Sequence, residues 1–358
     1  MTLPLGLRIG EGTIRHGRNE GVLFLEIPDA KDAYTIPYIQ SCRDLEISAD
    51  FGDPDIAEIG LSLSGPGGTV EERLLKRGLK SVVFRGIAPG EYTLGAAAKD
   101  RDGKTRGQFQ CSRIGVGTIF AAIGDSITEG YYGECFDKTG NLSAGDLPPE
   151  AVSRDGRNFP QFGPTTAQHM SRPHCMKSWM TDLNNLLSEE LARPVFIANE
   201  GWGGYRTSGY LELMTKDHNW QRRMALLRPD VWLIHLGVND ERGRRCAGEV
   251  AADLEAIIDL LMDRHGAKPE AIFLAKPCYD YADGAEAILS SYCRVIDDLI
   301  ARRGLSRGPD FFDAYSRDKQ RYYGSDPVHP NIEGMRRMAE LWAEAILHRP
   351  GKWEGART

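Results

Sequence analysis

The segment around which the chain is organised spans residues 118–130 and reads TIFAAIGDSITEG. Its apolar run, residues 118–123, has the length and composition of a buried strand. The run stops at Gly124 and Asp125, and Ser126 follows where a turn leads into a predicted helix. A helix N-terminus offers free backbone N–H groups to a developing anion, which suits a nucleophile. The same turn is also an ordinary helix N-cap, so the segment needs support from the rest of the chain.

Strands alternate with helices from about residue 116 onward. After the strand at 118–123, apolar runs predict further strands at 195–198, 231–236, 271–275 and 311–314. Helical spacing of apolar residues predicts helices over 176–191, 247–265 and 285–303, and a last helix after Pro330. This alternation is typical of a parallel sheet with helices on both faces.

The first 115 residues have a different pattern. Short segments with partial alternation of apolar and polar residues predict strands at 21–27, 44–51, 59–64, 81–85 and 91–98. Turns rich in glycine, proline and aspartate separate them, and Asp102-Gly103 is a hairpin signal. We therefore expect an all-β sandwich, loosely similar to fibronectin type III or immunoglobulin domains or to a jelly roll. No cluster of titratable residues here looks catalytic, which favours a structural or carbohydrate-positioning role.

Length and composition limit the possible functions. A chain of 358 residues suggests two domains, which we place at 1–115 and 116–350. The net charge of -7 disfavours nucleic acid as a partner, and no apolar run is long enough to span a membrane. No signal peptide is visible, which favours the cytoplasm, or export if the N-terminus is trimmed. The seven scattered cysteines include no Cys-x-x-Cys pair, which disfavours a zinc ribbon. Nothing in the sequence indicates an oligomeric state.

Three more short motifs fall in loops of the predicted sheet. They are NEGWGGYRT at 199–207, GVND at 237–240 and DPVHP at 326–330. Each alone is explained by an ordinary turn or helix entry. Ligands of an open parallel sheet gather outside the carboxyl ends of its strands, so all four motifs are expected to converge on one crevice.

Together, the four motifs resemble the sequence blocks of the GDSL or SGNH hydrolase superfamily, over roughly residues 116–348. The resemblance implies a flavodoxin-like, three-layer α/β/α domain with a parallel sheet. A β-domain ahead of such a domain is similar to the arrangement in carbohydrate esterases. The second block departs from the family pattern because Gly203 stands where a serine is usual. Either Gly203 or Gly204 could then donate its N–H, and we favour Gly204.

The resemblance assigns roles that fit acyl transfer. Ser126 is the expected nucleophile, His329 the base that removes its proton, and Asp326 the group that orients His329. The N–H groups of Ser126 and Gly204 and the side-chain amide of Asn239 are expected to form the oxyanion hole. This chemistry requires no metal and no organic cofactor.

The segment from Tyr131 to about residue 175 is long, irregular and rich in glycine and proline, so we expect it to cover the crevice. The expected substrate-binding residues are Tyr131, Trp202, Tyr205 and Arg206; Tyr132 is a further candidate. Aromatic rings with polar edges suit sugars better than long acyl chains, although packing of the loop would explain them equally well. His235 lies in an apolar strand and is expected to be a hydrogen-bonded core residue. His169 and His174 fit no strong metal-ligand spacing.

These observations favour a serine esterase that removes small acyl groups, with acetyl as the expected group, from a carbohydrate. The expected partner is thus a small-molecule or oligosaccharide ester substrate. A lipid or thioester hydrolase, or an O-acyltransferase of the same fold, is the alternative within catalysis. A non-catalytic carbohydrate-binding protein is the alternative from another class.

Overall fold

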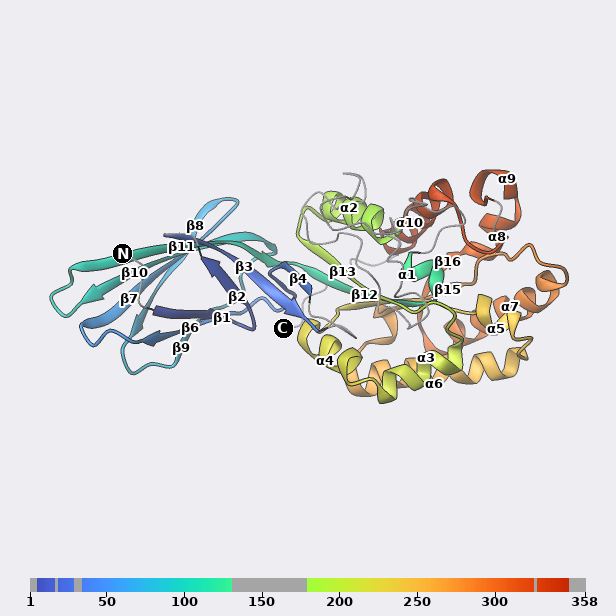
Figure 1. Cartoon of the computed structure of the whole chain (residues 1–358), viewed down its shortest axis with the longest axis horizontal. Helices are drawn as coiled ribbons and strands as arrows, with labels where there is room; N and C mark the ends of the chain where they lie inside the picture. Colours follow the sequence, from blue (N-terminus) through green and yellow to red (C-terminus); the bar gives the residue numbers. More distant parts are fainter. Residues whose placement is uncertain (1–4, 17–18, 29–33, 131–178, 325–326, 348–358) are drawn as a thin grey trace, which may run out of the picture.

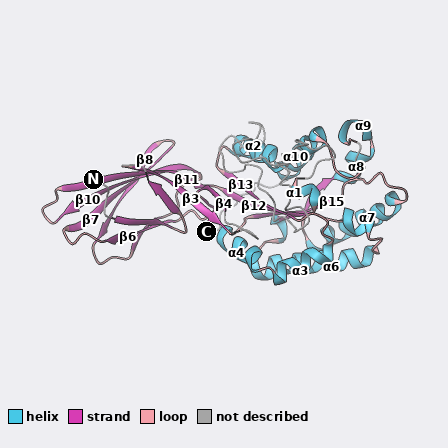
Figure 2. Cartoon of the chain, viewed as in Figure 1, coloured by secondary structure: helices cyan, strands magenta, loops and turns pink. Residues whose placement is uncertain are grey.

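The computed structural model describes residues 5–16, 19–28, 34–130, 179–324 and 327–347. A β-rich part and an α/β part follow one another along the long axis of the molecule (Figure 1). Figure 2 shows that strands make up the first part, whereas strands and helices alternate in the second. Tyr131, Tyr132, Asp326, His169 and His174 lie outside the described residues.

Two sheets make up the β-rich part. The smaller sheet is antiparallel, in the order β1 (Leu5–Ile9), β6 (Leu45–Phe51) and β9 (Ser81–Phe84). The larger sheet comprises β2 (Thr13–His16), β3 (Glu20–Ile27), β4 (Tyr34–Pro37), β5 (Ile39–Gln40), β7 (Ile56–Gly65), β8 (Gly68–Lys76), β10 (Gly90–Asp100) and β11 (Thr105–Val116). Its pairs are antiparallel except where β11 runs parallel to β3 and β5.

Alternating burial explains how these sheets pack. Along β10, every second residue from Tyr92 to Ala98 is buried, because successive side chains of a strand point to opposite faces. Leu94 of the larger sheet and Ile47 of the smaller sheet belong to one apolar core. The predicted β-sandwich is thereby confirmed, and all five predicted strands are present. The Asp102-Gly103 turn joins β10 to β11, with Gly103 at a φ of +78°.

A five-stranded parallel sheet forms the centre of the α/β part. Its order is β13 (Val195–Gly201), β12 (Thr118–Gly124), β14 (Val231–His235), β15 (Ile272–Lys276) and β16 (Ser306–Asp310). Since β12 comes first in sequence among these five strands, this is the 2-1-3-4-5 order of flavodoxin-like folds. The expected α/β/α architecture is confirmed.

Helices cover both faces of this sheet (Figure 1). One face carries α2 (Trp179–Leu191), α8 (Phe311–Ser316) and α10 (Ile332–Leu347), and the other carries α3 (Thr207–Lys216), α4 (His218–Leu227), α6 (Ala247–His265) and α7 (Ala285–Arg303). Ile119 and Ala121 of β12 face one core, and Phe120 and Ala122 face the other. The shorter helices are α1 (Ser126–Glu129), α5 (Val238–Arg242), α9 (Lys319–Tyr322) and the 3₁₀ helix η3 (Pro269–Ala271). No helix within the described ranges has both the length and the apolar character to cross a membrane.

One strand prediction is wrong. Residues 311–314 form the start of α8, and the fifth strand is the preceding segment, β16. The Asp310 side chain accepts a hydrogen bond from the Asp313 N–H at 3.0 Å and so caps the helix. As an edge strand, β16 tolerates Pro309, because one side of it needs no ladder hydrogen bonds. Its polar sequence therefore gave no apolar signal.

The two parts meet closely. Gly117 N donates to the Gln40 carbonyl at 2.9 Å, and Arg223 Nη1 of α4 donates to the Pro28 carbonyl at 3.1 Å. A single apolar cluster includes residues of both parts. The expected boundary at residues 115 and 116 falls at the end of β11, and the division into two domains stays a prediction.

Candidate active site

The four motifs meet at the carboxyl end of the parallel sheet. The first motif continues past the end of β12, the second begins in the last residues of β13, and the third follows β14. These three strands are adjacent in the sheet, with β12 in the middle. The fourth lies between α9 and α10. In a sheet of this order the crevice is expected between β12 and β14, because β12 connects to β13 on one side and β14 connects to β15 on the other.

The turn at residues 124–126, the nucleophile turn, places Ser126 at the start of α1. Asp125 caps this helix, because its Oδ1 accepts a hydrogen bond from the Ile127 N–H at 3.0 Å. Gly124 allows the helix to fold back tightly, since a Cβ there would lie 2.0 Å from Thr128 Oγ1. Ser126 is itself buried, with 9% of its surface exposed.

His329 approaches Ser126 from the loop before α10. Its Nε2 lies 2.9 Å from Ser126 Oγ, although the two residues are 203 positions apart in the sequence. This distance is within the hydrogen-bonding range that proton transfer between a nucleophile and a base requires.

The glycine turn, which we define as residues 202–205, lies beside the nucleophile turn. Gly203 N donates to Glu129 Oε2 at 2.6 Å. The Gly204 N–H has no acceptor among the described residues, and the φ of Gly204, +79°, favours glycine. Asn239 Nδ2 donates to the Tyr205 carbonyl at 3.1 Å, which places the amide against the same turn. Of the two glycines considered for an oxyanion hole, Gly204 therefore has the available donor.

Two buried carboxyl groups flank Ser126 in the sequence. Asp125 is 1% exposed and Glu129 is 3% exposed. Burial raises the pKa of Asp125 to about 7, although the Ile127 N–H and His329 act in the opposite direction. Burial likewise raises the pKa of Glu129 to about 8, against the effect of the Gly203 N–H. Both groups keep their protons to a higher pH than exposed carboxyl groups do.

A buried polar network fixes the end of the glycine turn to α5. Asp240 accepts hydrogen bonds from the N–H and the Oγ1 of Thr207, at 3.0 and 2.8 Å. Arg245 Nη1 lies 2.8 Å from Asp240 Oδ1 and 2.6 Å from Asp253 Oδ2. Asp240 follows Asn239 directly, so the network holds the two motifs together. Glu129 and Asp240 were not among the residues predicted from the sequence. Their only sequence signal was their place inside the GDSITEG and GVND motifs.

The model of the GDSL-like lipase/acylhydrolase family matches residues 122–337, more than half of the chain. The chain belongs to this family. It is therefore a hydrolase of carboxylic esters. Among curated proteins, none matches the chain.

Solved structures of several hydrolases are similar to this GDSL-like hydrolase. A lipase/acylhydrolase from Enterococcus faecalis is 18% identical, with a TM-score of 0.42, and the match covers 66% of this chain and 99% of the other. A catalytic mutant of an acetylxylan esterase from Geobacillus stearothermophilus is 19% identical, with a TM-score of 0.44 and coverage of 68% and 99%. An α/β hydrolase from the metagenome of Lake Arreo, Spain, is 20% identical, with a TM-score of 0.43 and coverage of 65% and 94%.

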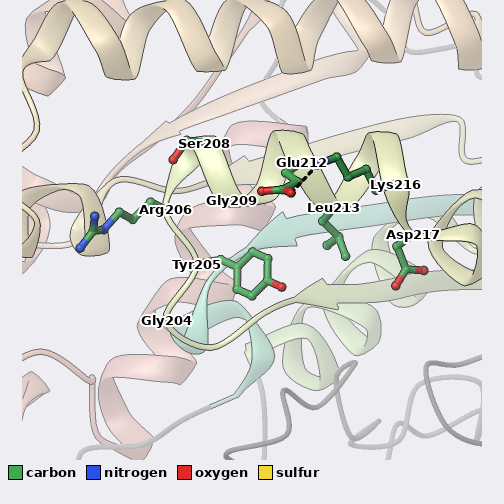
Figure 3. A pocket seen from close by; sticks show the side chains of 9 residues that line it. All are labelled: Gly204, Tyr205, Arg206, Ser208, Gly209, Glu212, Leu213, Lys216 and Asp217. Atoms are coloured by element: carbon green, nitrogen blue, oxygen red, sulfur yellow. Dashed lines mark hydrogen bonds and ion pairs between the residues drawn. The ribbon is translucent and has the colours of Figure 1, made fainter.

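Three of the expected substrate-binding residues lie in or next to the glycine turn of this hydrolase. Trp202 is 7% exposed, and its ring packs against Tyr205 with 5.3 Å between ring centroids. Tyr205 and Arg206 line a hollow that runs from Gly204 along α3 to Asp217 (Figure 3). The Arg206 side chain points away from the other labelled side chains, whereas the Tyr205 ring lies along the hollow. Trp202 does not line the hollow.

His235 is buried as expected, but its predicted hydrogen bonds are absent. Neither ring nitrogen has a partner among the described residues, and the ring packs edge-on against Phe311. Burial lowers the pKa of His235 to about 3, so the ring is neutral. Within the described part of the chain, no cluster of His, Cys, Asp or Glu has the composition to hold a metal ion.

Proposed function

We propose that this hydrolase is a serine esterase that removes acetyl groups from a carbohydrate. Ser126 is the nucleophile and His329 the base, and Asp326, three residues before His329, orients the imidazole. The N–H groups of Ser126 and Gly204 and the amide of Asn239 form the oxyanion hole. The observation that carries this proposal is the 2.9 Å contact between Ser126 Oγ and His329 Nε2.

The proposed reaction has two steps. Ser126 Oγ attacks the acyl carbon while His329 Nε2 accepts the hydroxyl proton, and the carbonyl oxygen becomes an oxyanion in the hole. The intermediate collapses, and the leaving alcohol takes the proton from His329. Water then attacks the acyl-enzyme, again losing its proton to His329, and the acid leaves while Ser126 regains its proton.

The hollow beside Gly204 supports a carbohydrate as the alcohol part of the ester. It offers the face of Tyr205 together with Ser208 and the exposed ion pair between Glu212 and Lys216, whose Nζ–Oε1 distance is 2.7 Å. Leu213 is the one aliphatic side chain in its lining. Aromatic faces and hydrogen-bonding edges suit a sugar ring, whereas a long acyl chain needs apolar walls.

The β-rich part has a proposed role as well. We propose that residues 1–115 form an accessory domain of the immunoglobulin-like, fibronectin-like or jelly-roll kind beside a catalytic domain at 116–350. Ser126, Gly204, Asn239 and His329 all lie in the α/β part. This distribution supports an accessory role for the first part.

Acetate release from a panel of acetylated oligosaccharides tests the proposal, with p-nitrophenyl acetate and long-chain p-nitrophenyl esters for comparison. We expect turnover of acetylated sugars and of p-nitrophenyl acetate by the wild type, and none by Ser126→Ala. Preference for long chains would favour a lipid hydrolase, and transfer of acetyl to an added alcohol in place of water would favour an acyltransferase. Sugar binding without turnover would favour a carbohydrate-binding protein.

A pair of variants tests the hollow separately. Glu212→Ala with Lys216→Ala should raise KM for an acetylated oligosaccharide several-fold and leave p-nitrophenyl acetate unaffected. Asp313→Ala with Arg317→Ala removes another exposed ion pair of the same i,i+4 spacing, at the C-terminal end of α8, and is the matched control. Equal effects of both double variants, or no effect of either, would count against the hollow as a sugar site.

A further inference from the structure

The glycine turn is held in place by the helix that carries Ser126. Trp202 N donates to the Gly124 carbonyl at 3.0 Å, and Asn199 Nδ2 donates to the Glu129 carbonyl at 3.1 Å. Gly203 N donates to Glu129 Oε2 at 2.6 Å. In the last of these hydrogen bonds the acceptor is the Glu129 side chain, so a substitution of Glu129 can remove it.

Glu129 has little freedom to move. A Cβ on Gly201 would lie 2.1 Å from the Glu129 N, so β13 and α1 are in backbone contact at this point. The Glu129 side chain extends from the same place to Gly203 and is buried there. A hydrogen bond to a buried carboxyl group in such a site is short and strong, and it is costly to lose.

The hydrogen bond decides which N–H of the turn is available. With the Gly203 N–H occupied by Glu129, the Gly204 N–H is the one left without an acceptor among the described residues. We propose that Glu129 is a positioning residue, which fixes the glycine turn so that Gly204 and not Gly203 donates to the oxyanion. The inference rests on the esterase mechanism proposed above.

Glu129 acts in this role as a hydrogen-bond acceptor and not as a charge. An ionised carboxylate beside the oxyanion hole would repel the negative charge that develops there. Burial and the neighbouring Asp125 raise the pKa of Glu129, which keeps the carboxyl neutral in the neutral pH range. The other titratable groups near these motifs are His329 at Ser126, Asp240, which is paired with Arg245, and Glu200 of β13, which is paired with Arg223 of α4.

Two substitutions separate the acceptor from the charge. Glu129→Gln keeps an acceptor oxygen at the same reach and loses the ionisable group, whereas Glu129→Asp keeps the ionisable group and withdraws it by one methylene. We expect Glu129→Gln to retain kcat within a few-fold. We expect Glu129→Asp to lower kcat about tenfold to a hundredfold with little change in KM, since a misplaced oxyanion donor weakens transition-state binding. For both variants, kcat and KM are measured with p-nitrophenyl acetate. Circular dichroism gives the amount of folded protein to which kcat is normalised.

The pH profile of kcat is the second readout. The wild type should lose activity as Glu129 ionises at alkaline pH, and Glu129→Gln should lack that loss. Equal kcat in Glu129→Asp and the wild type, or a fall in Glu129→Gln as large as in Glu129→Asp, would overturn the inference. Ser126→Ala distinguishes failure of the proposed serine mechanism from failure of the proposed role of Glu129. If Ser126→Ala stays active, the serine mechanism is wrong. If Ser126→Ala is inactive while Glu129→Asp is fully active, only the role of Glu129 is wrong.

Discussion

The two parts of the molecule differ in what they bury. Among the described residues of the β-rich part, Asp100 is the one buried polar or charged side chain apart from tyrosine and cysteine. In the α/β part, Asp125, Ser126, Glu129, Asn199 and Asp240 are all buried near the ends of β12, β13 and β14, and others are buried elsewhere. Burial of a polar group costs free energy unless it finds hydrogen bonds. The contrast indicates that this cost falls mainly in the α/β part, around the motifs of the proposed active site.

The largest expected effect tests whether the chemistry depends on His329. His329→Ala should lower kcat for p-nitrophenyl acetate by about 10⁴-fold to 10⁶-fold, because Ser126 loses its base. His218→Ala, at an exposed position on α4, is the control and should leave kcat unchanged. Steady-state kinetics of the two variants give the comparison. A His329→Ala protein that turns over at a tenth of the wild-type rate would rule out this base.

The next effect concerns stability. Arg223 and Glu200 form a two-pronged ion pair, with distances of 2.9 and 2.7 Å and side chains 2% and 1% exposed. Arg223→Met leaves Glu200 buried without its charge partner, which should lower the free energy of unfolding by about 3–5 kcal/mol. Urea denaturation measures the loss. Adding Glu200→Gln to Arg223→Met should recover part of it, and a single variant as stable as the wild type would contradict the account.

A matched pair of aspartates sharpens the comparison between the two parts. Asp240→Asn should lower kcat about tenfold to a hundredfold, because the acceptor that fixes Thr207 against Asn239 is weakened. Asp100→Asn removes charge from the buried aspartate of the β-rich part, which accepts hydrogen bonds from Lys104 N and Arg106 Nε. It should lower Tm and leave kcat unchanged. A fall in kcat with Asp100→Asn would show that the β-rich part contributes to turnover.

The smallest expected effect is the pH dependence of stability. Asp125 and Glu129 have folded pKa values raised to about 7 and about 8, whereas both ionise near pH 4 in the unfolded chain. The folded state therefore binds protons that the unfolded state has released, and stability is lost as pH rises towards 8. His235, with its pKa lowered to about 3, contributes stability that is complete above pH 6.5. Between pH 6.5 and 8 the free energy of unfolding should fall by on the order of 1 kcal/mol.

Urea denaturation across this range provides the measurement, with Glu129→Gln as the comparison. The variant should show a smaller fall, because one of the two raised carboxyl groups is gone. A wild-type free energy that rises or stays constant over the range would contradict the burial of these groups in their neutral form.

Much of the fold was predictable because local and global signals agree. Helices α6 and α7 match their predicted ranges, since each ends at a glycine, Gly266 or Gly304, in the left-handed conformation. The signal was absent where a strand is short or charged. Strand β8 reads GTVEERLLK and is at the edge of its sheet, and β16 reads SRGPD without a large apolar residue. Neither therefore shows the alternation of a core strand.

The site was predictable only in part. The four motifs could be found from their order, and in the fold Ser126 and His329 are in contact. The tasks of Glu129 and Asp240 could not be inferred, because their partners are backbone N–H groups 74 and 33 residues away. Side chains that bond to distant backbone leave no periodic or motif signal, and only the tertiary fold reveals them.

The unbroken apolar cluster shared by the two parts limits how the chain can be cut. Deleting residues 1–116 would remove Gln40 and Pro28, which accept hydrogen bonds from Gly117 and from Arg223 of α4. It would also expose apolar surface of the α/β part to solvent. A catalytic fragment prepared in this way should aggregate during purification. A smaller soluble enzyme would first require substitution of the newly exposed apolar residues by charged ones.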